Sequence, residues 1–194
     1  MSRTEALRSA RESFTGGSVF DDTAELVIDC SEGSAPDTRM LRQALGRFAT
    51  GVTVVTTRTS AGKLEGLTAN SFSSVSLDPP LILWSLRRAA PSFSGFIEAS
   101  WFAINVLGTH QTSLSRHFAT ASPDKFADLS WTEGLGGCPL LPDCLARFEC
   151  RTETIVEAGD HNIFIGRVNR ATHREGEALL FNAGRYCVPN ILQA

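Results

Sequence analysis

The sequence predicts one mainly β domain with peripheral helices, and three observations support this fold class. Short runs rich in Val, Ile, Thr, Phe and Trp recur along the chain and are separated by Gly, Asn, Asp and Pro, which is the pattern of antiparallel strands joined by turns. From Ala146 to Val156 small or apolar residues alternate with charged ones, as in a strand with one buried face. With 194 residues, 42% of them hydrophobic, the chain can bury one ordinary core.

The first 36 residues differ in composition from the rest. They are rich in Ser, Gly, Asp and Glu, contain one short apolar patch at Leu26–Ile28, and end in a turn-like run before Asp37. This composition is typical of a disordered leader, and the alternative is an arm that packs on a partner subunit. We therefore expect an N-terminal extension over residues 1–36 and one folded domain over residues 37–194.

The folded domain is expected to begin with a helix and continue as a sheet. Apolar residues at helical steps from Met40 to Phe48 predict an amphipathic helix that stops near Gly51. About seven or eight strands follow, and we expect the sheet to close into a barrel because closure removes exposed edges. The main predicted strands are 52–57, 67–75, 81–86, 101–107, 146–156, 163–172 and 178–181, with helices at 91–98 and 111–119.

Composition argues against several classes of partner. A net charge of −3 and a pI near 5.8 give no field that would attract nucleic acid or an anionic membrane. No run reaches the roughly 18 apolar residues of a spanning helix, and the N-terminus shows no signal-type run, so we expect a cytoplasmic protein. The cysteines are odd in number and lack CxxC spacing, which predicts reduced thiols, with Cys150 in the core, and no metal site. They are Cys30, Cys138, Cys144, Cys150 and Cys187.

The segment Gly66–Ser76 is the most unusual part of the chain. Small hydroxyl and amide side chains crowd a stretch that otherwise has strand character. Such a face buries little apolar area, so a polar partner is expected against it. A flat heteroaromatic ring with carbonyl and imide edges would suit, because backbone N–H groups can approach it closely. The other interpretation is a strand whose Ser and Thr side chains face solvent.

A second polar feature follows at the end of the next predicted strand. Ser85 and the pair Arg87–Arg88 precede Pro91 and Ser92, where a helix is expected to begin. A hydroxyl and a guanidinium at such a place can hold a phosphate, although a solvated basic corner explains the same residues. Regular strand–helix alternation and a GxGxxG motif are both missing from the sequence, which argues against a Rossmann dinucleotide domain.

Taken in order, these segments resemble the flavin reductase family over about Met40 to Tyr186. The resemblance rests on Phe48–Thr56, on Gly66–Ser76 followed by Pro79-Pro80, and on further motifs downstream. These are Trp101–Leu107, Asp124-Lys125-Phe126, and Gly159-Asp160-His161 leading into Gly166. It implies a split β-barrel that binds FAD or FMN and works as a homodimer.

The resemblance also implies roles for individual residues. His161 is the expected catalytic residue, placed near the nicotinamide and flavin, where its ring can donate to a carbonyl or carboxamide oxygen. The isoalloxazine ring is expected against Thr68, Ala69, Asn70 and Ser71. The ribityl phosphate is expected near Ser85, Arg88 and Ser92, with Asn105 and Phe126 close to the same pocket.

The implied activity is an NAD(P)H:flavin oxidoreductase, with NADH favoured over NADPH, that passes reduced flavin to a separate monooxygenase. Hydride transfer between the two cofactors needs no acid–base dyad from the protein, and the sequence shows none. One alternative is an FMN-dependent oxidase of the pyridoxamine-phosphate-oxidase-like barrel. Another is a non-catalytic flavin-binding module. The sequence leaves FAD against FMN, and the identity of the monooxygenase, open.

Overall fold

The computed structural model describes residues 25–190, which divide into two units between Leu41 and Arg42. Most of the predicted N-terminal extension, residues 1–24, lies outside the described residues. Its remaining part, residues 25–36, contains no helix or strand. The predicted first helix is present as α2 (Thr38–Leu45). The sheet and the cavities belong to the second unit, from Arg42 onward.

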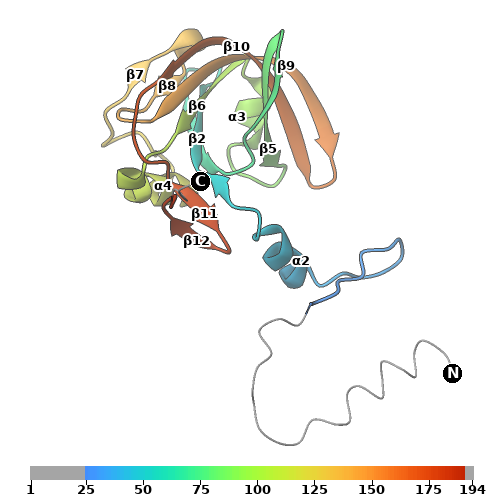
Figure 1. Ribbon diagram of the computed structural model, residues 1–194. Coiled ribbons are helices and arrows are strands. Elements are labelled where there is room, and N and C mark those ends of the chain that lie inside the picture. Colours follow the sequence, from blue (N-terminus) through green and yellow to red (C-terminus); the bar gives the residue numbers. More distant parts are fainter. Residues whose placement is uncertain (1–24, 191–194) are drawn as a thin grey trace, which may run out of the picture. The chain divides into compact units, whose positions relative to one another are not determined.

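The second unit is built on one antiparallel sheet of seven strands, in the order β3-β2-β6-β9-β10-β5-β4 (Figure 1). Every pairing in it is antiparallel, so the predicted fold class is confirmed. The strands are β2 (Thr53–Arg58), β3 (Leu64–Ala69), β4 (Ser73–Leu77), β5 (Pro80–Arg87), β6 (Trp101–Val106), β9 (Ala146–Ala158) and β10 (His161–His173).

The smaller elements surround this sheet. Helices α3 (Phe93–Glu98) and α4 (Thr112–Ala119) lie where helices are predicted, with a 3-10 turn η1 (Thr109–Gln111) before α4. Strand β1 (Thr50–Gly51) pairs with β11 (Leu180–Asn182), which pairs with β12 (Arg185–Cys187). Strands β7 (Thr132–Glu133) and β8 (Pro139–Leu140) flank a second 3-10 turn, η2 (Leu135–Gly137).

One expectation is wrong: residues 67–75 are not a single strand. The chain leaves the sheet after Ala69 at the end of β3, crosses in three residues, and re-enters as β4 at Ser73. These two strands are the opposite edges of the sheet. The crossing contains Asn70 and Ser71 but neither Gly nor Pro, so the two strongest signals that would have split the predicted strand are missing from it.

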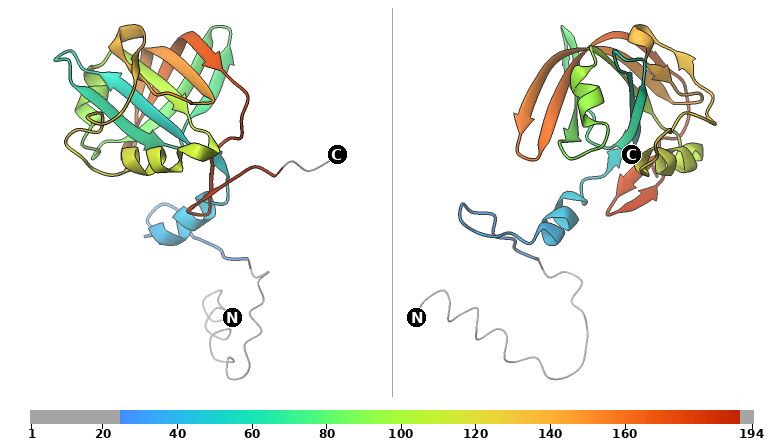
Figure 2. Two further views of the ribbon diagram at one scale, coloured as in Figure 1. Left: turned by 90° about the vertical axis from the view of Figure 1, so that its left-hand side faces the viewer. Right: turned by 180° about the vertical axis from the view of Figure 1, so that it is seen from behind.

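The short crossing forces the sheet to curl. Four Cα steps from Ala69 to Ser73 span at most about 14 Å. The edges of a flat sheet of seven strands would be about 29 Å apart at the usual strand spacing. The sheet therefore bends until β3 and β4 approach each other, and Figure 2 shows this curved, partly open barrel.

Aromatic side chains fill the inside of the curve. Trp84 of β5 stacks on Phe164 of β10, with ring centroids 4.7 Å apart, and meets Phe96 of α3 edge-on at 5.0 Å. All three are almost completely buried. In Figure 1, α3 lies within the curve of the sheet, while α4 lies at its lower end beside β11 and β12. Cys150 lies in the same core with no exposed surface, as predicted.

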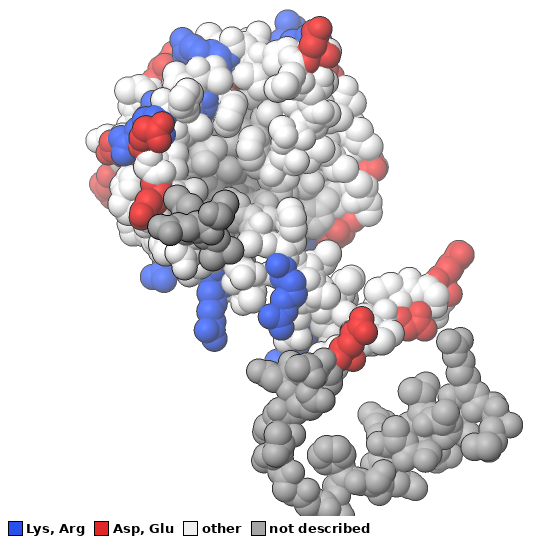
Figure 3. Space-filling model, in the orientation of Figure 1, with Lys and Arg blue, Asp and Glu red and all other residues white. Residues whose placement is uncertain are grey.

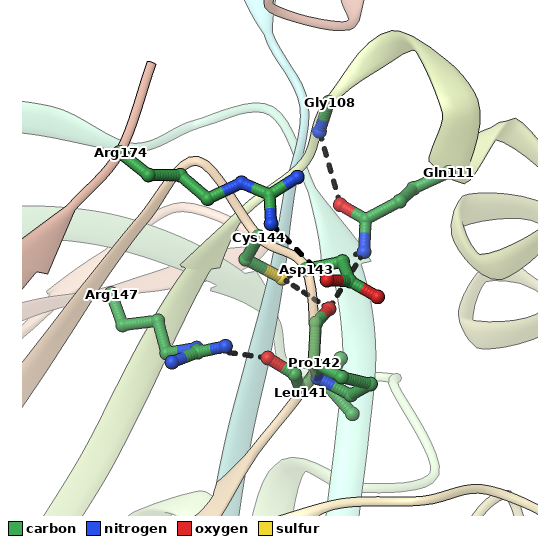
Figure 4. A network of polar contacts seen from close by, with 8 residues as sticks. All are labelled: Gly108, Gln111, Leu141, Pro142, Asp143, Cys144, Arg147 and Arg174. Carbon is green, nitrogen blue, oxygen red and sulfur yellow. Dashed lines mark hydrogen bonds and ion pairs between the residues drawn. The ribbon is translucent and has the colours of Figure 1, made fainter. Parts of the chain in front are cut away.

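A polar network fastens the start of α4 to the chain before β9 (Figure 4). The Gln111 side chain accepts the Gly108 N–H at 3.0 Å and donates to the Pro142 carbonyl at 2.9 Å. Arg147 donates to the Leu141 carbonyl at 2.8 Å. These bonds satisfy buried backbone groups that would otherwise cost free energy. They also fix the position of α4, whose C-terminal half borders the site described below.

Strand β9 does not alternate regularly between buried and exposed residues. Glu149 is expected on its solvent-facing side but is only 3% exposed. Its carboxylate pairs with Arg170 of β10 and accepts the Leu135 N–H at 2.6 Å, so it holds η2 against the sheet. Burial alone would raise the pKa of Glu149. The bonds from Arg170 and Leu135 outweigh it and keep this pKa below the ordinary value of 4.5.

We predict that this carboxylate makes the stability of the domain pH-dependent. Since the folded-state pKa is lowered, the stabilisation is complete above about pH 4.5 and is lost as the pH falls through the folded-state pKa. Glu149→Gln should therefore lower the free energy of unfolding by about 1–3 kcal/mol at neutral pH, and this difference from the wild type should shrink in acid. Urea unfolding at several pH values measures both. Glu153→Gln, which breaks the exposed pair with Arg167, is the control. A deficit that does not change with pH would contradict the prediction.

Candidate flavin site

A cavity of about 500 Å³ opens between strand β3, the turn before α3, and a third wall made by the end of α4 and the segment that follows it. Its walls are mainly apolar, and the polar groups among them come from all three segments. Such a site, apolar with a few convergent polar groups, is typical of a pocket for a small organic ligand. The lining residues are Glu65–Thr68 of β3, Ala90–Ser92, and Phe118, Ala119, Ala121–Pro123 and Lys125.

A second hollow, of about 430 Å³, lies beside the crossing from β3 to β4. Residues Phe48–Gly51 form one side of it and Asn70–Ser73 the other. The predicted ring-binding run is therefore divided between two places. Thr68 lines the first cavity, Asn70 and Ser71 line the second, and Ala69 points into the core with 8% of its surface exposed.

Two of these hydroxyl groups hold the wall of the site in position. The Thr68 hydroxyl donates to the Ser115 carbonyl of α4 at 2.6 Å, which fixes β3 against that helix. The Ser71 hydroxyl accepts the Ser85 N–H at 2.9 Å and donates to the Ser85 carbonyl at 3.1 Å. These two hydrogen bonds fasten the crossing to β5 and bring Ser71 and Ser85 together.

The predicted phosphate residues are separated by the turn between β5 and α3. Ser92 is buried and lines the 500 Å³ cavity. Arg88 is not among the lining residues: its guanidinium is half exposed and lies 3.5 Å from the Glu157 carboxylate. The Arg88 N–H donates to the Asp160 carbonyl at 2.9 Å, so its backbone anchors the start of this turn.

His161 begins β10, opposite Arg87 at the end of β5. The Nδ1 atom of its half-exposed ring lies 2.7 Å from the Asp160 carboxylate. This hydrogen bond holds the pKa of Asp160 below its usual range despite partial desolvation, so the carboxylate is ionised at neutral pH and accepts the Nδ1–H. The other ring nitrogen, Nε2, is left for a ligand.

Asn105 and Phe126 do not line the 500 Å³ cavity. The completely buried Asn105 amide donates to the Val54 carbonyl at 3.1 Å and accepts the Leu141 N–H at 2.9 Å. Its hydrogen bonds are thus used to join the sheet to the segment before β9. Phe126 packs edge-on against Phe118, with centroids 5.3 Å apart, and so supports the cavity wall from behind. Their predicted contacts with flavin stay predictions.

Lys125 and Glu65 are the charged lining residues that the sequence did not assign to the site. Lys125 stands in the motif Asp124-Lys125-Phe126, from which only Phe126 was assigned to the site. Glu65 belongs to an ordinary strand pattern. No periodicity could reveal them, because they meet only when the segment after α4 folds back onto β3.

Charge is unevenly spread over the domain surface. On the face shown in Figure 3, Lys, Arg, Asp and Glu lie mostly toward the edges of the domain. Within the described residues, no helix is both long and apolar enough to cross a membrane.

The chain is similar in sequence to named flavin reductases and reductase components of monooxygenases. The chain is 49% identical over 150 residues to the FMN reductase (NADH) SmoA of Agrobacterium fabrum, covering 77% of this chain and 85% of that protein. It is 45% identical over 151 residues to the reductase component of the flavin-dependent trigonelline monooxygenase of Acinetobacter baylyi, covering 78% of this chain but only 49% of that protein.

Solved structures give the same result. The NADH:FAD oxidoreductase SgcE6 of Streptomyces globisporus, in complex with NAD and FAD fragments, superposes with a TM-score of 0.74 at 41% identity, covering 78% of this chain and 92% of that one. Residues 45–189 match the family described as the flavin reductase like domain. The barrel, the cavity beside its edge strand and these similarities together place the chain in the flavin reductase family.

Proposed function

We propose that this protein is an NADH-dependent flavin oxidoreductase that reduces FAD or FMN and supplies the reduced flavin to a partner monooxygenase. The observation that carries the proposal is the 500 Å³ cavity, in which Thr68 and Ser92 face the same space. These residues come from the two segments that the sequence assigns to the flavin ring and to its phosphate.

The lining of the cavity fits a flavin. Leu67, Pro91 and Phe118 offer apolar surface for a flat aromatic ring. Thr68 and Ser92 supply polar groups at separate points of the wall, which can orient a ligand that has a polar ring edge and a phosphorylated chain. The cavity is open to solvent, as it must be if flavin is to leave after it has been reduced.

The cofactors supply the chemistry, because hydride passes between the nicotinamide and the flavin themselves. The protein needs only to bind and orient the two rings and to limit the access of water. We assign ring binding to Thr68–Ser71 and phosphate binding to Ser85, Arg88 and Ser92. The hydrogen bonds between Ser71 and the Ser85 backbone join the first run to the strand that carries Ser85, and the Thr68–Ser115 bond holds β3 against α4.

The names of the relatives support the choice of donor and partner. SmoA is named as an NADH-using FMN reductase, and the Acinetobacter baylyi relative as the reductase component of a monooxygenase. Both flavins occur among the relatives' names, so we propose FAD or FMN as the substrate. A cytoplasmic location is part of the proposal, since the five cysteines are free thiols and such thiols persist in a reducing compartment.

The central test is the rate of NADH oxidation by the purified chain with no flavin, with FMN and with FAD. Oxidation should require added flavin and saturate with it, and NADPH should be a poorer donor. Tightly retained, stoichiometric FMN without NADH oxidation would instead favour the FMN-dependent oxidase. Flavin binding without any turnover would favour the binding module.

We propose that His161 binds the nicotinamide and that Asp160 positions it. With Nδ1–H donated to Asp160, Nε2 of the neutral ring can accept a carboxamide N–H of the bound nucleotide, and the doubly protonated ring can donate from Nε2 to the carboxamide oxygen. His161→Ala should therefore raise the KM for NADH by about tenfold, the usual upper range for one lost hydrogen bond, and leave flavin affinity unchanged. Asp160→Asn should produce a smaller rise. Steady-state kinetics measure both changes, and His173→Ala, at an exposed position, is the control. A KM for NADH that is unchanged in His161→Ala would show that His161 does not bind the nicotinamide.

We also propose a homodimer. The outer face of β9, β10 and β5 carries an apolar patch: Val156 is 43% exposed, and Ile163, Ile165 and Leu83 are half-buried, with Val156 paired to Ile163 and Ile165 paired to Leu83. A second copy that packs on this face would remove that area from water.

Sedimentation at micromolar concentration should give twice the 21.0 kDa chain mass, and Ile165→Asp should shift the measured mass toward that of the single chain. A wild-type protein that sediments as a monomer would contradict the proposal.

A further inference from the structure

Lys125 is the one cation among the described residues that line the 500 Å³ cavity. It follows α4 in sequence and reaches back to the end of that helix and to β3. Its ammonium donates to the Phe118 carbonyl at 2.7 Å and to the Gly66 carbonyl at 3.1 Å. An ammonium has three N–H donors, so one is not used by these two bonds.

The position of this ammonium is fixed from several sides. The Lys125 carbonyl lies 2.8 Å from His117 Nε2, and the Asp124 carboxylate accepts the Phe126 N–H at 2.8 Å. Gly66 has to be glycine here, because a Cβ would lie 2.6 Å from the Phe118 ring. The close approach of that ring to β3 brings the two carbonyls that hold Lys125 together.

The Lys125 ammonium has no carboxylate among its direct hydrogen-bond partners, although it is partly removed from water. Part of the ammonium is removed from water, and this desolvation lowers the pKa of Lys125, although the charge of Glu65 opposes the effect. Glu65 itself is paired with the Lys63 ammonium at 2.6 Å. The direct partners of Lys125 are therefore two neutral carbonyls, and a partly desolvated cation with a free donor favours an anionic ligand.

We propose that Lys125 is a flavin-binding residue that donates to an anionic oxygen or nitrogen of the flavin in this cavity. The inference rests on the proposed function, because it takes this cavity as the flavin site. Two parts of a flavin carry such charge: the phosphate of FMN and FAD, and the N1 region of the reduced ring. Ser92 and Thr68, assigned to these two parts, line the same cavity.

The test compares wild-type protein, Lys125→Met and Arg174→Met in titrations with FMN, FAD and riboflavin. Arg174 makes an exposed pair with Asp143 in the network of Figure 4 and serves as the charge-matched control. If Lys125 binds the phosphate, Lys125→Met should weaken FMN and FAD by about tenfold and leave riboflavin within about twofold, because riboflavin lacks the phosphate.

If Lys125 binds the ring instead, FMN and riboflavin should be affected alike, and the reduced form more than the oxidised form. A tenfold selective loss for the reduced form lowers the midpoint potential of the bound flavin by about 30 mV. Either pattern supports the inference. Unchanged binding, or equal weakening of every flavin in both redox states, would overturn it. A wild-type protein that binds no flavin would overturn the proposed function as well.

A second measurement uses the unaltered chain and so does not depend on the folding of the variant. Acetylation of lysines, followed by mass spectrometry, should show that saturating FMN protects Lys125. Lys63, whose side chain is 62% exposed, should not be protected and serves as the internal control. Equal acetylation of Lys125 with and without FMN would overturn the inference.

Discussion

The three-residue crossing from β3 to β4 is the constraint on which the rest of the structure depends. It joins the two edges of a seven-stranded sheet, so the sheet must curl into an incomplete barrel. The double hydrogen bond between Ser71 and the Ser85 backbone holds the crossing against β5. The same crossing separates the two hollows, because Thr68 precedes it and lines one, while Asn70 and Ser71 belong to it and line the other.

The core determines how rigidly the site is held. Trp84, Phe96 and Phe164 fill the inside of the curve, and stacked or edge-on aromatic pairs add to the stability that their buried area provides. Since Phe96 belongs to α3 and Trp84 to β5, this packing fixes the turn between them, which carries Ser92 into the cavity. The second core cluster, with Phe118 and Phe126, does the same for the wall that follows α4.

Three buried polar side chains hold the framework of the domain together. Asn105, Gln111 and Glu149 are buried, and each joins segments far apart in the sequence. Their hydrogen-bonding capacity is taken up by the protein, so they hold the framework together. Lys125 differs because it carries a positive charge, its two hydrogen-bond partners are neutral carbonyls, and its third N–H is not used by these two bonds. The three buried side chains therefore stabilise the fold, whereas Lys125 is suited to bind a ligand.

The sequence by itself determined the fold class, most of the strands and helices, and the family, because alternating and helical periodicities and ordered motifs are local properties of the chain. It also located Thr68 and Ser92, which the structure brings to one cavity. Only the tertiary structure decided that residues 67–75 form two strands, that Asn105 and Glu149 act inside the framework, and that Lys125 faces the cavity. These outcomes depend on contacts between β3, β9, α4 and the segments folded onto them, and contacts between residues far apart in the chain leave no periodic signal in it.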